Sequence, residues 1–198
     1  MGNFPAAGNQ WRVIALMQPG DEELYRLMRN GNQDAFAQLY ERREPALHRY
    51  ALHVSGSPAV AEEVAHEVFL QLMGPSCRFD GAKGSLESFL YGIARNLIRV
   101  VRRQGPVAEV VDQPCEHDIL GDLIGNETTA ALHRTLRDLP ERYRDVIVLC
   151  DLEERSYEDV ALLIGRPVGT VRSRLHRARA LLAAKLKRLN APSEVFSR

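Results

Sequence analysis

The stretch Ser156–Leu182, SYEDVALLIGRPVGTVRSRLHRARALL, decides the fold of its part of the chain. Ser156 is a typical helix N-cap, and the apolar residues after it recur at helical spacing. Gly165-Arg166-Pro167 ends this first helix, because glycine accepts a left-handed turn and proline cannot continue the ladder of backbone hydrogen bonds. A second amphipathic helix follows from Val168. This pattern predicts a helix-turn-helix, whose second helix fits the major groove of DNA.

The second helix is strongly basic. Residues Arg166–Arg188 include eight Lys or Arg and no Asp or Glu, although the net charge of the 198-residue chain is +0. Phosphates attract such a surface. The alternative is a solvated amphipathic helix that merely ends in basic residues, but the turn and the apolar spacing favour DNA binding. The polar face of this helix carries Arg172, Ser173, His176 and Arg177.

Composition predicts an all-α protein. Hydrophobic residues make up 45% of the chain and aromatic residues only 7%, and β-branched runs are sparse. The three cysteines, Cys77, Cys115 and Cys150, lie far apart and indicate neither a zinc site nor a disulfide framework, so we expect reduced thiols in a cytoplasm. No apolar run approaches the length of a membrane span, and no secretion signal is expected at the N-terminus.

One segment of different composition divides the chain. Gln104–Glu127 contains six acidic residues, two prolines, three glycines and no Lys or Arg, which is typical of a linker. The predicted organisation is therefore two small helical domains joined by an acidic linker. Its segments are a loosely ordered start at 1–20, a first domain at 21–104, the linker at 105–127, a second domain at 128–190 and a tail at 191–198.

Within the first domain, we expect a helix from Asn32 that Pro45 kinks or divides. A second helix opens at Ser57-Pro58, a cap followed by a first-turn proline, and runs to about Met73. A third covers Ser85–Arg103. Its predicted buried residues are Leu86, Phe89, Leu90, Ile93, Leu97 and either Val100 or Val101. The second domain should hold four helices, at Thr128–Leu139, Pro140–Cys150, Ser156–Ile164 and Val168–Leu189.

The Ser85–Arg103 helix is a second candidate for contact with nucleic acid. Several arginines lie toward its C-terminus, and aromatic residues lie in and just before it. Aromatic rings stack on unpaired bases while arginines meet phosphates, a pattern typical of single-strand binding. The alternative is that the arginines complement a helix C-terminus and that Phe89 belongs to the core, which we favour for Phe89. In the preceding predicted helix, which opens at Ser57-Pro58, Glu62, Glu63 and Glu67 form an acidic stripe. This stripe indicates either a solvent-exposed face or a docking surface for a basic partner.

Enzymatic chemistry has no clear signature in the sequence. His48 and His53 are five residues apart, which does not match the zinc-binding H-E-x-x-H motif. There is no glycine-rich phosphate loop and no G-x-S-x-G nucleophile elbow. We therefore expect no catalytic residue, no metal site and no cofactor.

Together, five stretches resemble a bacterial extracytoplasmic-function (ECF) sigma factor, the small two-domain class of RNA polymerase sigma subunits. The resemblance covers about Asp21 to Leu189. Its stretches are DAFAQLYERREPAL, AEEVAHEVFLQL, RFDGAKGSLESFLYGIARNLIRVVRR, LRDLPERYRDVIVL and SYEDVALLIGRPVGTVRSRLHRAR. The order of these stretches argues against an ordinary helix-turn-helix regulator.

The resemblance implies the function of each domain. Residues 21–104 would be sigma region 2, which binds core polymerase and melts the promoter −10 element, and residues 128–190 would be sigma region 4, which reads the −35 element as duplex. The implied partners are RNA polymerase core at its β′ clamp and β flap, promoter DNA as duplex and as opened single strand, and a separate anti-sigma factor. The linker would follow the path of nucleic acid through the polymerase.

The resemblance also assigns residues. The loop Arg78–Ser85 matches the segment that captures a flipped base of the opened strand. The implied −35 contacts are Thr170, Arg172, Ser173, His176 and Arg177. The implied −10 and melting contacts are Arg78, Phe79, Asp80, Lys83, Ser85, Arg95, Asn96, Arg99, Arg102 and Arg103. The implied polymerase contacts are Glu62, Glu63, His66 and Glu67.

Three positions depart from the usual ECF pattern. Phe89-Leu90 stands where a tryptophan is usual, Arg99 stands where aspartate is common, and His66 stands where glutamine or aspartate is typical. These departures bear on the melting contacts and the promoter sequence. A polymerase-independent helix-turn-helix regulator remains the alternative, and it predicts tight duplex binding by the chain alone. A nucleic-acid-processing enzyme would need a catalytic cluster that the sequence does not show.

Overall fold

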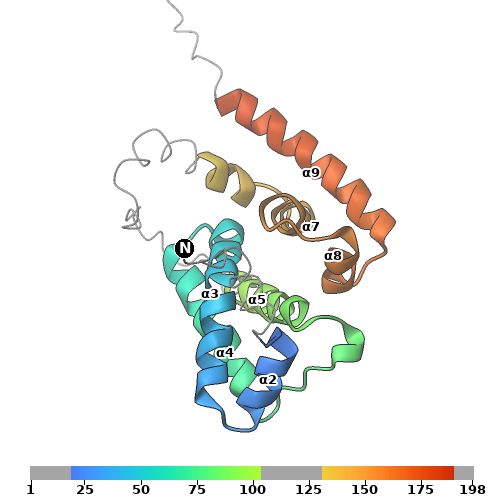
Figure 1. The fold of residues 1–198 in the computed structure, drawn as a ribbon. Helices are drawn as coiled ribbons and strands as arrows, with labels where there is room; N and C mark the ends of the chain where they lie inside the picture. Colours follow the sequence, from blue (N-terminus) through green and yellow to red (C-terminus); the bar gives the residue numbers. More distant parts are fainter. Residues whose placement is uncertain (1–18, 104–130, 190–198) are drawn as a thin grey trace, which may run out of the picture. The chain divides into compact units, whose positions relative to one another are not determined.

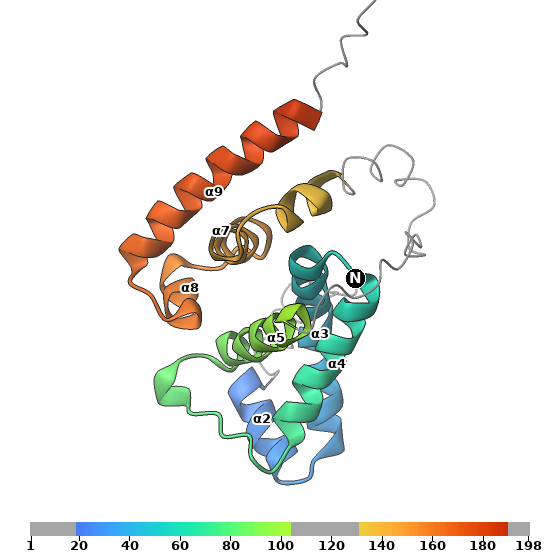
Figure 2. The ribbon, with the colours of Figure 1, turned by 180° about the vertical axis from the view of Figure 1, so that it is seen from behind.

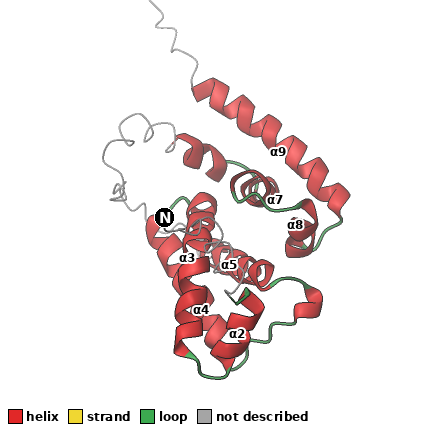
Figure 3. Cartoon of the chain, in the orientation of Figure 1, coloured by secondary structure: helices red, strands yellow, loops and turns green. Residues whose placement is uncertain are grey.

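The computed structural model describes residues 19–103 and 131–189, and these residues are helices joined by loops (Figure 3). Most of the predicted N-terminal segment 1–20, all of the linker 105–127 and the tail 191–198 lie outside the described residues. The chain divides into two compact units, residues 1–42 and 43–198, and we describe each by itself. The all-α fold class is confirmed. No described helix is long and apolar enough to cross a membrane.

The first unit contains helix α2, Asp21–Arg29, and the start of helix α3, Gln33–Ser55. An ion pair of 2.9 Å between Asp21 and Arg42 joins the start of α2 to α3, and Arg42 also donates to the carbonyl of Pro19 at 3.0 Å. The side chain of Asn32 accepts the Ala35 N–H at 3.0 Å and so caps α3. Leu24, Met28, Ala35 and Leu39 are buried.

We expected Pro45 to kink or divide this helix; α3 is continuous through Pro45, so a division at this proline is wrong. Proline leaves one carbonyl of the preceding turn without its N–H donor. Pro45 is exposed, so water can reach that side of the helix and satisfy the carbonyl. The apolar residues of the following turns, Leu47, Tyr50 and Val54, stay on one buried face.

In the second unit, helices α4, Pro58–Met73, and α5, Leu86–Arg103, pack against each other (Figure 1). The hydroxyl of Ser57 accepts the Val60 N–H at 3.4 Å, so the predicted cap and first-turn proline of α4 are confirmed. A short 3₁₀ turn, η1 (Gly81–Lys83), lies in the loop between them.

The buried face of α5 differs from the predicted one. Leu86 and Leu90 are buried as expected, but Tyr91 and Ile98 are buried too, while Val100 is exposed. The half-buried residues are Phe89, Ile93, Leu97 and Val101. Tyr91 packs edge-on against Tyr50 of α3, with 5.2 Å between the ring centroids. Because this contact places Tyr91 in the core, the buried face of α5 is rotated about the helix axis relative to the predicted face.

The C-terminal helices follow the predicted order. Helical residues 131–137 precede α7 (Glu141–Ile147), the π-helical turn η2 (Val148–Leu152), α8 (Tyr157–Ile164) and α9 (Val168–Leu189). Helix α9 packs on α7 and α8, as both views show (Figures 1 and 2). The buried guanidinium of Arg144 donates to the carbonyls of Leu136 at 2.6 Å, Leu139 at 2.7 Å and Arg137. It therefore satisfies the carbonyls at the end of the preceding helix.

Candidate nucleic-acid interface

The helix-turn-helix predicted from the sequence is present as α8, its turn and α9. Ser156 caps α8 by accepting the Asp159 N–H at 3.0 Å. Gly165 ends α8 with a left-handed φ of 63°, a conformation that favours glycine. Val160, Val171 and Leu175 are buried between the helices. Local capping and a small apolar core therefore hold α9 at a defined angle to α8.

The face of α9 away from that core is exposed. Arg172, Ser173, His176 and Arg177 are exposed and Thr170 is half-buried. A tyrosine lies near each of these two arginines. Arg172 lies 5.8 Å from the centre of the Tyr157 ring. The side chains of Arg177 and Arg142 lower the pKa of the Tyr143 hydroxyl. Among the described residues, neither Arg172 nor Arg177 pairs with a carboxylate, so both can reach phosphates or base edges.

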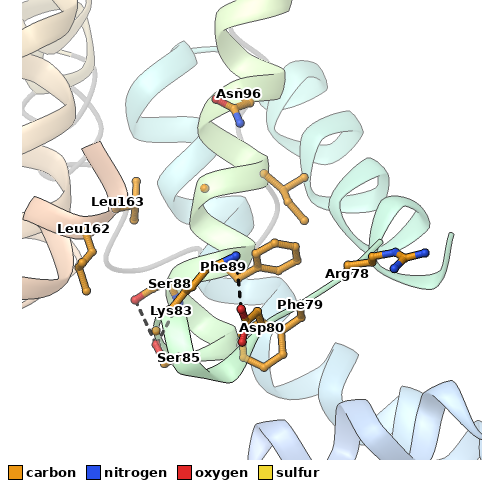
Figure 4. Close-up of a pocket in the computed structure, with 13 residues that line it drawn as sticks. Arg78, Phe79, Asp80, Lys83, Ser85, Ser88, Phe89, Asn96, Leu162 and Leu163 are labelled. Carbon is orange, nitrogen blue, oxygen red and sulfur yellow. Dashed lines mark hydrogen bonds and ion pairs between the residues drawn. The ribbon is translucent and has the colours of Figure 1, made fainter. Parts of the chain in front are cut away.

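A second feature is a cavity of about 430 Å³ beside the loop that joins α4 to α5. The structure brings together around it six of the predicted −10 residues, namely Arg78, Phe79, Asp80, Lys83, Ser85 and Asn96. Phe79 and Phe89 stack at a tilt, with 5.6 Å between centroids. Figure 4 shows this aromatic pair on one side of the cavity, with Leu162 and Leu163 of α8 on the other.

The polar groups at the cavity are held in place by short-range bonds. Asp80 accepts the Ala82 N–H at 3.1 Å and pairs with Lys83 at 3.3 Å. These two interactions, the backbone bond first, lower the pKa of Asp80. Ser85 accepts the Ser88 N–H at 3.2 Å and so caps α5. A cavity of this size, lined by apolar side chains and a few oriented polar groups, is large enough for a small ligand.

The arginines of α5 are placed differently from those of α9. Arg95 donates to Asp145 of α7 at 2.7 Å, and Arg99 pairs with Glu141 of α7 at 2.8 Å. Arg102 donates to the carbonyl of Val54 at 3.0 Å, and its burial lowers its pKa. Arg103 is exposed. Three of the four predicted α5 arginines are therefore engaged within the chain.

The predicted polymerase-contacting residues share one face of α4. Glu62, Glu63 and His66 are exposed and Glu67, which accepts a bond from Gln71 at 3.0 Å, is half-buried. The sequence reasoning missed two apolar residues on the same face, Leu70 and Met73, which are 57% and 44% exposed. Their helical spacing from His66 was the signal that could have found them. An exposed apolar patch rimmed by charges is typical of a protein-binding surface.

Sequence reasoning also missed residues contributed by distant segments. The cavity-lining Leu162 and Leu163, and the acids Glu141 and Asp145 that face α5, lie far from that helix in the sequence, and no local pattern marks them. The described residues contain no cluster of three His, Cys, Asp or Glu side chains that could hold a metal ion.

Comparison with known proteins gives two family matches. Sigma-70 region 2 matches residues 39–106, and sigma-70 region 4 matches residues 129–182. The ECF RNA polymerase sigma factor SigM of Mycobacterium tuberculosis is 33% identical over 195 residues, which cover 96% of this chain and 94% of the relative. SigE of Mycolicibacterium smegmatis, also an ECF RNA polymerase sigma factor, is 31% identical over 153 residues. The match covers 73% of this chain but only 59% of the length of that relative.

A solved structure shows the same architecture. The sigma factor RpoE of Bartonella quintana, in complex with the anti-sigma factor NepR, matches with a TM-score of 0.62 and 26% identity. The match covers 77% of this chain and 96% of that one. Two sigma regions in order, an all-helical fold and a relative that matches across nearly the whole chain lead to one conclusion. The chain belongs to the ECF family of RNA polymerase sigma factors.

Proposed function

We propose that this chain binds core RNA polymerase and directs it to promoters through separate contacts with the −35 and −10 elements. The observation that carries the proposal is the presence, on one chain, of a helix-turn-helix with an exposed basic face and a cavity flanked by aromatic rings. The first suits duplex DNA. The second suits an unpaired base, which stacks on aromatic side chains and bonds to polar groups at its edge.

In this mechanism, Arg172, Ser173, His176 and Arg177 of α9 read the −35 duplex, with Thr170 near the backbone. The loop Arg78–Ser85, together with Asn96, holds a base of the opened −10 strand, and Phe79 and Phe89 supply the stacking surface. Capturing the flipped base offsets the few kcal/mol that unpairing and unstacking cost. The chain itself performs no bond chemistry.

The exposed face of α4 is the proposed contact with core polymerase at its β′ clamp, and the helix-turn-helix domain is proposed to meet the β flap. Leu70 and Met73 add apolar area beside the acidic stripe of Glu62, Glu63 and Glu67, a composition suited to a basic, partly apolar partner. We also propose that an anti-sigma factor binds the chain, as one binds RpoE of Bartonella quintana.

The test is run-off transcription with purified bacterial core polymerase on a pool of promoters, with and without the chain. Transcripts that start at defined sites only when the chain is present support the proposal. Tight, specific duplex binding by the chain alone without stimulation of transcription would identify a polymerase-independent regulator instead. The Arg172→Ala/Arg177→Ala variant should lose promoter choice but keep polymerase binding.

A further inference from the structure

The basic helix α9 carries a bidentate ion pair that the proposed −35 contact does not use. The guanidinium of Arg179 donates to both carboxylate oxygens of Asp151 in η2, from Nε at 2.8 Å and from Nη2 at 2.7 Å. Two such bonds made at once fix the orientation of the guanidinium. Asp151 therefore matches the charge of one of the eight Lys or Arg side chains in the basic run Arg166–Arg188.

This pair lies at one edge of the exposed face of α9. Arg179 follows His176 by three residues and Arg172 by seven, and residues at these spacings share one side of a helix. Tyr157, the first residue of α8, lies beside the same row. Its ring centre is 5.8 Å from Arg172, and Asp151 first, then Tyr157, raise the pKa of Arg179. A duplex that meets Arg172 and His176 would therefore bring its phosphates close to the pair.

The pair changes what Arg179 offers to DNA. Sequence-independent binding to a duplex comes from Lys and Arg side chains that displace counterions from phosphates, and each such contact steepens the dependence of binding on salt. An arginine that already makes two bonds to a carboxylate adds little to this binding, because its charge is matched and two of its donors are in use. Arg179 therefore differs from Arg172 and Arg177, although all three lie in the same basic run.

A second ion pair on α9 serves as a reference. Lys185 pairs with Asp138 at 3.3 Å, so the charges are the same as in the first pair. Lys185 follows His176 by nine residues, and since an α-helix has 3.6 residues per turn, this spacing is about two and a half turns. Lys185 thus lies on the side of α9 opposite His176, and its pair is turned away from the face proposed to meet DNA.

We propose that Asp151 is a positioning residue that holds Arg179 away from phosphates and so limits the sequence-independent part of duplex binding by α9. Residues of the same face that reach base edges then account for a larger share of the binding free energy. Asp151 itself need not touch DNA, because it acts through the guanidinium that it holds. The inference rests on the proposed function in one respect, namely that α9 meets duplex DNA.

The test measures how salt changes duplex binding by the free full-length chain. Fluorescence anisotropy with two labelled duplexes of unrelated sequence gives the dissociation constant from about 50 to about 200 mM salt, a range over which phosphate contacts weaken measurably. Asp151→Asn keeps the shape of the side chain and removes its charge, whereas Asp151→Glu keeps the charge. Asp151→Asn/Arg179→Met also removes the cation that the first variant releases. Because the pair is partly exposed, these variants should fold, and circular dichroism checks that they do.

Asp151→Asn should bind both duplexes more tightly, and by the same factor, because a phosphate contact carries no sequence information. One added contact should steepen the plot of log Kd against log salt by about 0.9, so the gain in affinity should shrink about threefold from 50 to 200 mM salt. Asp151→Glu should behave like the parent chain, and the Asp151→Asn/Arg179→Met variant should lose the added slope. Asp138→Asn, the matched control, changes the net charge equally and should leave the slope unchanged.

Three results would overturn the proposal. An equal change in Asp138→Asn would show that net charge alone matters. An added slope that persists without Arg179 would show that another group is released. An unchanged slope in Asp151→Asn is read beside Arg172→Ala/Arg177→Ala in the same assay. If that double variant binds more weakly, only the role of Asp151 fails; if it binds like the parent chain, α9 does not meet DNA and the proposed −35 contact fails with it.

Discussion

The arginines of α9 and those of α5 contrast sharply, although both helices end in basic residues. Arg172 and Arg177 are exposed and lie near tyrosines, whereas Arg95 and Arg99 pair with carboxylates and Arg102 bonds a backbone carbonyl. One helix presents its charges ready for phosphate, and the other has them matched within the chain. The partners of an arginine, rather than its place in a basic run, therefore decide which contacts it is ready to make.

Arg144 is the buried arginine whose guanidinium is bonded to several carbonyls within the chain. Its replacement should give the largest loss of stability. Arg144→Met fills the same space but leaves the carbonyls of Leu136 and Leu139 buried without a donor. Because each such loss costs about 1–3 kcal/mol, we expect the free energy of unfolding to fall by about 3 kcal/mol or more. Urea denaturation measures this. Arg142→Met, at an exposed neighbour, should change stability by less than about 0.5 kcal/mol, and equal losses would contradict the distinction.

The exposed arginines of α9 should matter for DNA binding and not for stability. Arg172→Ala/Arg177→Ala should leave unfolding nearly unchanged and weaken duplex binding by the reconstituted polymerase complex by about 1–3 kcal/mol for each base-contacting arginine. The dependence of binding on salt should flatten if phosphate contacts are lost. Arg188→Ala, near the end of the same helix, is the control, and an equal effect from it would mean that only overall charge matters.

Backbone geometry should matter less than either class of arginine. Gly165 holds a left-handed φ of 63° with open space around it, so Gly165→Ala adds backbone strain and no clash. We expect the free energy of unfolding, measured by thermal denaturation, to fall by about 1 kcal/mol. Gly165→Asn should lose less, because asparagine tolerates this conformation. Equal losses would show that side-chain space, and not φ, sets the requirement at this turn.

The smallest effect concerns pH. His53 Nδ1 lies 3.0 Å from His133 Nε2, and burial, followed by His133 and Arg49, lowers the pKa of His53 from 6.5 to about 4. As the pH falls, His53 therefore binds a proton in the unfolded chain at a higher pH than in the folded chain. The contribution of neutral His53 to stability is complete above pH 6.5 and is lost as the pH falls toward 4. Since the site is partly exposed, we expect a loss below about 1 kcal/mol. His53→Gln should remove this pH dependence and His176→Gln should not.

Local patterns predicted the helices well, because caps, turns and apolar spacing act over a few residues. Ser57, Ser156 and Gly165 have the predicted roles, and the exposed face of α9 follows from its spacing. The errors arose where distant groups decide the outcome. The contact of Tyr91 with Tyr50 of α3 places Tyr91 on the buried face of α5, and solvent exposure let α3 run through Pro45. The partners of Arg95 and Arg99 lie more than 40 residues away, beyond the reach of any periodicity.

The most direct test of the account maps both DNA contacts in one experiment on reconstituted polymerase at a promoter identified by run-off transcription. Permanganate reactivity reports the opened −10 strand, and nuclease protection reports the −35 duplex. We predict that Asn96→Ala and Phe79→Ala reduce strand opening while −35 protection persists, and that Arg172→Ala/Arg177→Ala removes −35 protection first. Loss of both signals in equal measure from either set of variants, with polymerase binding intact, would contradict the assignment of separate contacts to α5 and α9.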